Sequence, residues 1–160
     1  MDNEAKYQLT KETRIVHGHI LYRIQALKTF GSIQKNQKGG FVEHLSNLSQ
    51  HGTCWVYPNA CVYGNAWVQD DAQILEQAQV YGQAEIWHQA VITNQARVYD
   101  QALVFHKGVV GGASKVYEKA RVSDNAQVMG HSTVCGSAWV YCKGRVSGRE
   151  EITGYTRLIG

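Results

Sequence analysis

The stretch NACVYGNAWV, residues 59–68, repeats itself after six residues: a small residue, a variable residue and a valine are followed by a turn. The same spacing continues in both directions. From Val56 to Leu158, every sixth residue is valine, isoleucine or leucine, which makes eighteen consecutive positions. The residue two places earlier is small in sixteen of these hexads, and only Glu150 and Thr156 depart. Such regularity indicates one recurring structural unit.

The spacing predicts very short strands separated by corners. Residues two apart point to the same side of a strand, and Gly, Asp and Asn after each aliphatic tolerate the positive φ of a tight corner. Strands this short must pair with the coils above and below. At a stride of eighteen, equivalent residues match, most clearly Tyr63, Tyr81, Tyr99 and Tyr117. We therefore predict an all-β fold, a single-stranded parallel β-helix with about six triangular 18-residue coils over residues 53–160.

These hexads resemble the hexapeptide-repeat, left-handed β-helix family, and most closely its YdcK-like branch, found in prophage and bacterial genomes. The resemblance covers residues 53–160 and extends upstream through GGFVEHLSNLSQHGTCWVY, residues 39–57. In the family's acyltransferases glycine directly follows the aliphatic, whereas here that place mostly holds other residues, among them Tyr, Trp and Gln. Left-handed coiling is implied by the resemblance alone. General crossover chirality favours the opposite hand, so the right-handed helix of bactofilin-like filament proteins is the competing architecture.

The N-terminal residues 1–39 lack the repeat and predict a small β cap with a linker. Residues 7–16 and 19–27 have the character of two strands, and Gly18 between them favours a hairpin. The β-helix then spans residues 40–160. Val42 and Leu48 are again six apart, which predicts an irregular first coil followed by a two-residue slip. The C-terminal coil has no cap in the sequence, so we expect a homo-oligomer or a partner there.

Composition sets limits on location and chemistry. No stretch of about 18 apolar residues occurs and the N-terminus lacks a signal-peptide core, so we expect a cytoplasmic protein without membrane association. The cysteines form two pairs with members seven apart, unlike zinc knuckles, and are expected to be free thiols: Cys54, Cys61, Cys135 and Cys142. The formal charge of +3 makes nucleic acid only a weak alternative partner.

One corner collects titratable residues at the eighteen-residue stride: Asp70, His88, His106, Asp124 and Cys142. A metal or acid–base site is the functional interpretation, and exposed corners that accept any polar residue are the alternative. We predict no metal, with His88, His106, Asp70 and Asp124 as weak candidate ligands. The hexads continue without an inserted loop that could form a pocket, so no catalytic residue and no cofactor is predicted.

The charge distribution points to a binding role. Residues 53–105 contain one basic residue against five acids, whereas residues 106–160 contain eight against four. Exposed Trp with Arg is typical of interfaces. The candidate binding residues are Trp67, Trp139, Arg121, Lys143, Arg145, Arg149 and Arg157. Trp67 and Trp139 share one predicted face.

The sequence thus favours a non-enzymatic binding protein whose rigid rod engages a macromolecular protein partner. The prophage-type resemblance implies an inhibitor of a bacterial host defence complex. An acyltransferase-like enzyme and a self-assembling, bactofilin-like structural element are the alternatives.

Overall fold

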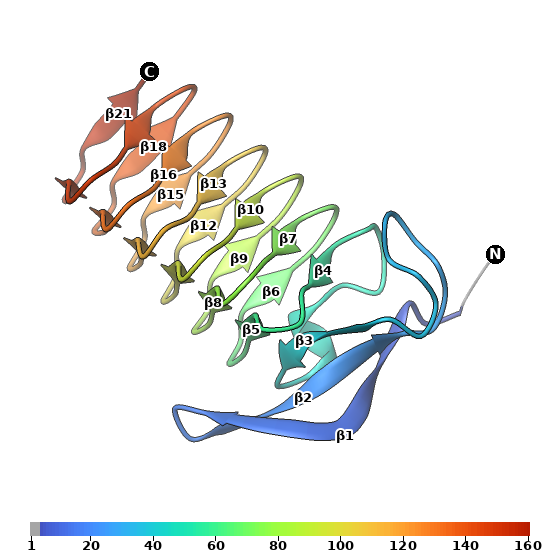
Figure 1. The fold of residues 1–160 in the computed structure, drawn as a ribbon. Coiled ribbons are helices and arrows are strands. Elements are labelled where there is room, and N and C mark those ends of the chain that lie inside the picture. The colour runs from blue at the N-terminus through green and yellow to red at the C-terminus, as the bar shows by residue number, and fades with distance from the viewer. Residues whose placement is uncertain (1–3) are drawn as a thin grey trace.

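The computed structural model describes residues 4–160, which form a stack of triangular coils with a hairpin at its N-terminal end (Figure 1). The described chain runs from the blue hairpin at one end of the stack to the red C-terminal coil at the other. Three sheets form the three walls. The predicted all-β parallel β-helix is therefore confirmed. Its handedness stays a prediction.

Each wall is one sheet, and its strands within the coils are two or three residues long. Sheet 1 consists of β1 (Tyr7–Val16), β2 (His19–Ala26), β3 (Lys38–Val42), β5 (Cys61–Val62), β8 (Gln79–Val80), β11 (Arg97–Val98), β14 (Lys115–Val116), β17 (Thr133–Val134) and β20 (Glu151–Ile152). Sheet 2 consists of β4 (Trp55–Val56), β7 (Gln73–Ile74), β10 (Val91–Ile92), β13 (Val109–Val110), β16 (Gln127–Val128) and β19 (Arg145–Val146). Sheet 3 consists of β6 (Trp67–Val68), β9 (Glu85–Ile86), β12 (Leu103–Val104), β15 (Arg121–Val122), β18 (Trp139–Tyr141) and β21 (Arg157–Ile159). A 3₁₀ turn, η1, spans Leu45–Asn47.

The strands of the coils stack in parallel at the predicted eighteen-residue offset. Val98 of β11 pairs with Val80 of β8 on one side and with Val116 of β14 on the other. Each short strand between the first and last coils therefore bonds to the coils before and after it, and not to its neighbour in sequence. This arrangement explains why two-residue strands persist, since every coil shares its hydrogen bonds with two others.

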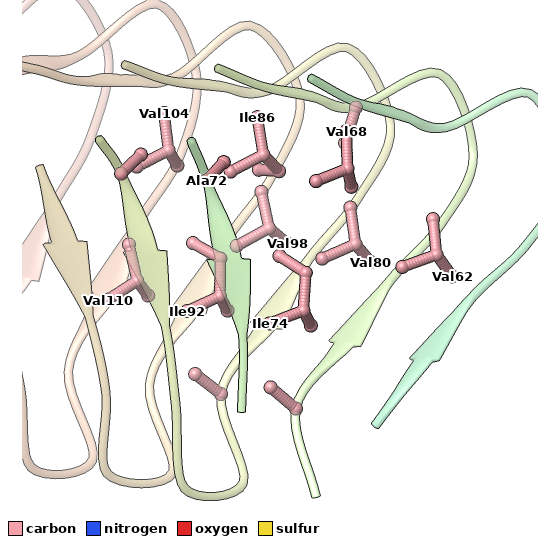
Figure 2. Close-up of a cluster of buried hydrophobic side chains, with 14 of the residues drawn as sticks. Val62, Val68, Ala72, Ile74, Val80, Ile86, Ile92, Val98, Val104 and Val110 are labelled. Atoms are coloured by element: carbon pink, nitrogen blue, oxygen red, sulfur yellow. The ribbon is translucent and has the colours of Figure 1, made fainter. Parts of the chain in front are cut away.

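The aliphatic position of each hexad points to the axis of the stack (Figure 2). These side chains are 0% exposed from Val56 through Val140, and the preceding alanines, such as Ala72 and Ala96, are equally buried. Burying one such aliphatic side chain contributes about 1.5–3 kcal/mol. The series ends at the C-terminus, where Ile152 and Leu158 are only half-buried.

The N-terminal end of the axis is closed by the cap. Tyr7 and Phe30 pack against Trp55 with ring centroids 6.3 and 5.3 Å away. Lys6 is 1% exposed, and its Nζ donates a hydrogen bond of 3.0 Å to the carbonyl oxygen of Cys54. Burial lowers the pKa of Lys6. The predicted cap is thus confirmed, and it covers strand edges that would otherwise be open.

The hairpin of β1 and β2 belongs to sheet 1 and also folds over the outer face of the next strands of that sheet, β3 and β5. Its turn uses His17 and Gly18, both at positive φ (48° and 85°), as a two-residue hairpin turn requires. Leu21 from the hairpin is buried with Phe41 and with Cys61 of the first regular coil. Periodicity predicts the hairpin but does not indicate which outer surface it covers.

The irregular first coil lies between the cap and the regular hexads. Val42 of β3 pairs in parallel with Val62, and Leu48 forms a bridge with Val68. Both offsets are twenty residues instead of eighteen, so the predicted two-residue slip is confirmed. With this coil the stack has about seven turns, one more than the hexads alone predict.

Several corner residues other than glycine have a positive φ, and the hydrogen bonds of their side chains help to stabilise this conformation. Asp100 and Asn94 have φ of 57° and 55°. Asp100 Oδ2 accepts a hydrogen bond of 3.2 Å from the amide of Glu118, and Asn94 Oδ1 accepts one of 2.9 Å from the amide of Gly112. Both side chains therefore bond the corner amide of the following coil, which offsets part of the cost of their backbone conformation.

The outer surface has the predicted aromatic stacks. Tyr63, Tyr81, Tyr99 and Tyr117 stack with centroid separations of 5.0, 4.9 and 4.9 Å. His17 of the hairpin turn extends this ladder, because its Nδ1 lies 2.9 Å from the hydroxyl of Tyr63. The ladder therefore connects the cap to the coils on the outer surface, and the aliphatic core connects them along the axis.

Candidate functional site

Three of the predicted binding residues form one continuous column on sheet 3. Trp139 of β18 pairs in register with Arg121 of β15 and with Arg157 of β21. Adjacent strands lie about 4.8 Å apart, so Arg121 and Arg157 occupy the coils on either side of Trp139. We call Arg121, Trp139 and Arg157 the Arg–Trp column.

The indole of the column is held in one orientation. Trp139 Nε1 donates a hydrogen bond of 2.9 Å to Ser123 Oγ, and its ring lies 4.7 Å from that of Tyr141. Trp139 is half-buried, whereas Arg121 and Arg157 are exposed. A fixed aromatic side chain with exposed arginines at the same position of both adjoining coils is a surface typical of interface centres. Sequence reasoning missed Ser123, whose only signal is its place just after the aliphatic Val122.

The other predicted binding residues lie elsewhere on the stack. Trp67 of β6 is 42% exposed at the opposite end of sheet 3, where its register neighbour is Glu85. Arg145 belongs to sheet 2. Lys143 lies in the corner after β18 and Arg149 in the corner after β19. The structure therefore brings together Arg121, Trp139 and Arg157, and distributes the remaining basic residues around the last coil.

The titratable column stacks along one corner as predicted. The rings of His88 and His106 are 4.9 Å apart and nearly parallel, at 6°. Asp70 Oδ2 accepts from the amide of His88 at 3.0 Å, and His88 Nδ1 accepts from the amide of His106 at 3.3 Å. His106 Nδ1 lies 2.9 Å from Asp124 Oδ1. The column thus has the same amide-bonding role as the other two corners.

The surroundings of this corner do not distinguish it as a metal or catalytic site. Within residues 4–160, no group of three or more His, Cys, Asp or Glu side chains converges as metal ligands would. An open groove of about 580 Å³ runs along the corner beside His88 and His106. The other two corners carry comparable grooves of about 430 and 610 Å³. The groove is therefore a general property of the corners.

Asp124 gives a pH-dependent prediction for this column. The amide of Cys142 and the side chain of His106 hold the pKa of Asp124 below its usual range. A lowered carboxyl pKa in the folded state contributes stability above about pH 4, which is lost as pH falls through the folded pKa. Because the carboxylate is solvent-screened, we expect Asp124→Asn to cost about 0.5 kcal/mol at pH 6 and less at pH 3.

The measurement is denaturant unfolding between pH 3 and pH 6. Glu85→Gln serves as the control, because that carboxylate lies exposed on the outer face of β9. Asp124→Asn should reduce the pH dependence of the unfolding free energy, whereas Glu85→Gln should leave it unchanged. An equal or larger loss for Asp124→Asn at pH 3 would contradict the sign of the effect.

Comparisons with known proteins add no assignment to this geometry. A scan of protein-family models gives no match to the chain, and neither does a search of curated proteins. In the part of the chain that the structure describes, no helix has the length and apolar character needed to cross a membrane. All four cysteines are free thiols, and only Cys142 is exposed.

Proposed function

We propose that the protein is a non-enzymatic binding protein that engages an acidic segment of a protein partner through the Arg–Trp column. The observation that carries this proposal is the register of Arg121, Trp139 and Arg157 on three successive coils. An extended acidic segment laid along sheet 3 could place carboxylates on both guanidinium groups and an apolar side chain on the indole. Arg with aromatic residues is the combination enriched where interfaces are strongest.

The charge distribution supports the same partner chemistry. Residues 106–160 contain eight basic side chains against four acids, so the half of the rod with the column attracts an acidic partner. Residues 53–105 contain one basic side chain against five acids, which disfavours the same partner near Trp67. The two ends of sheet 3 therefore offer a test surface and a control surface on one molecule.

The regular coils favour binding over catalysis. Strands follow one another at six-residue intervals from β4 to β21, so the surface consists of flat walls and open corner grooves. Flat, rigid walls suit recognition of an extended partner. The resemblance to the prophage-type branch makes a bacterial host defence complex the first partner to examine, and the free thiols fit a cytoplasmic location.

The direct test uses fluorescence anisotropy with acidic peptides that do or do not contain an aromatic residue. We expect Arg121→Glu and Arg157→Glu each to weaken binding about tenfold, because each variant turns an attraction into a repulsion. Trp139→Ala should weaken only the aromatic peptide. Trp67→Ala is the matched control, because it removes a Trp from the same sheet next to Glu85, and it should leave binding unchanged.

Two results would decide against the proposal. Equal binding by the Arg121→Glu variant and the unaltered protein would remove the column from the interface. Tighter binding to duplex DNA than to any acidic peptide, with an affinity that falls steeply as the salt concentration rises, would indicate that the partner is nucleic acid and not protein. In cells, the proposal predicts a host protein that co-purifies with the Trp67→Ala variant but not with the Arg121→Glu variant. Deletion of that host protein should alter infection by phage.

A further inference from the structure

The C-terminal coil presents three open strand edges at once. β19, β20 and β21 are the outermost strands of sheets 2, 1 and 3. The side chains at this end are only partly covered: Ile152 and Leu158 are half-buried, Ile159 is 61% exposed and Tyr155 is 89% exposed. Open edges with apolar residues are a template for pairing with another chain. The opposite end is sealed by Tyr7, Phe30 and Trp55.

The triangular shape of the C-terminal end determines which partner can pair with its open strand edges. Three edges arranged around a triangle can all be paired at once only by another triangular coil of the same size, and a second copy of this chain has one. Because the N-terminal end of each copy is capped, two copies can pair their open strand edges only through their C-terminal coils. We propose that the protein forms a closed, two-fold symmetric dimer in which the two C-terminal coils pair.

The spiral rise of the coils fixes the arrangement of the dimer. Each coil climbs one strand spacing per turn, about 4.8 Å, so the end of the rod is a ramp with a step next to Gly160. Two such ramps keep the same separation on all three walls only if the two-fold axis passes through β20 and the corner at the step. β20 then pairs antiparallel with itself across the axis, and β19 pairs antiparallel with β21 of the other copy.

The side chains fit this arrangement without direct charge repulsion. When the inward aliphatics meet, Val146 lies opposite the partner subunit's Leu158, and Ile152 lies opposite the partner subunit's Ile152. One residue away on β19 and β21, the outward Arg145 lies opposite the partner subunit's Ile159, and Arg157 opposite the partner subunit's Ser147. Direct opposition of like charges is thereby avoided.

The dimer would also bring Arg145 to the proposed binding surface. Within one chain Arg145 lies on sheet 2, away from the Arg–Trp column. Across the junction, sheet 3 of one copy continues into sheet 2 of the other, so the partner subunit's Arg145 joins the face that carries Arg157, at the position opposite Ile159. The dimer does not depend on the proposed function, because its test contains no ligand.

Sedimentation of residues 1–160 tests the proposal. We expect a monomer–dimer equilibrium with no larger species at protein concentrations up to the order of 100 µM. Ile159→Lys should raise the dimer dissociation constant about tenfold, because it places a cation opposite the partner subunit's Arg145. Combining it with Arg145→Glu should restore dimerisation. Ile15→Lys, at an even more exposed position (73%) on the hairpin, is the control and should have no effect.

A covalent test checks the register. In a chain with the exposed Cys142 replaced by asparagine, Glu151→Cys with Thr153→Cys should give a disulfide-linked dimer on mild oxidation, because these positions face each other across the axis. A monomer throughout the concentration range, open-ended polymers, or a dimer that is insensitive to Ile159→Lys would each overturn the proposal. Circular dichroism on every variant separates loss of dimer from loss of fold.

Discussion

Replacing Ile92 by alanine is expected to lower the free energy of unfolding by about 3 kcal/mol. Ile92 is 0% exposed on the axis and lies between Ile74 and Val110 of the adjoining coils. Its truncation removes apolar contact with both neighbours and leaves a cavity, because the coils are fixed at the spacing of their strands.

The chain supplies its own control for this prediction. Ile152 occupies the same hexad position in the last coil but is only half-buried. Ile152→Ala should therefore cost about 1 kcal/mol, measured in dilute protein by denaturant unfolding. Equal costs at the two positions would mean that stacking between coils contributes little to stability.

Replacing Gly130 by alanine is the second large effect, at about 3 kcal/mol. Gly130 has φ of 75°, and a Cβ there would lie 2.8 Å from both the amide nitrogen and the carbonyl oxygen of Gly148 in the next coil. The variant combines the cost of the left-handed conformation with a backbone collision. Neither coil can move away without breaking the strand pairs on both sides of the corner.

Gly148 separates the two contributions. It has nearly the same φ, 64°, but a Cβ added there meets nothing within 4 Å. Gly148→Ala should therefore cost only the conformational part, about 1 kcal/mol. Thermal or denaturant unfolding of both variants in dilute protein gives the comparison. A Gly130→Ala variant as stable as Gly148→Ala would show that the coils are not closely stacked at this corner.

Much of this fold could be predicted because each coil repeats the same six-residue pattern of a small residue, an aliphatic residue and a turn. The aliphatic at every sixth position defines the axis, and the tyrosines at every eighteenth position report three walls per coil. Even the slip before the regular hexads is visible in the spacing of Val42 and Leu48. The placement of the hairpin over Phe41 and Cys61 is not predictable in the same way, because it depends on contacts with no period.

The candidate site was predicted less completely. The stride of eighteen places Trp67, Arg121 and Trp139 on one wall, and the same arithmetic places Arg145 on the next wall. The basic C-terminal residues are close together in the sequence, but their spacing places them on different walls and corners of the stack. The anchoring of Trp139 by Ser123 depends on side-chain orientation, which the repeat does not encode.

The most direct test of the binding account is an NMR titration that follows the indole N–H signals of the four tryptophans during addition of an acidic, aromatic peptide. Trp139 donates its indole hydrogen to Ser123 beside both arginines, so its signal should shift as the peptide binds. The signal of Trp67, on the same sheet beside Glu85, should stay unchanged. Saturable binding of the peptide with an unmoved Trp139 signal would contradict the account.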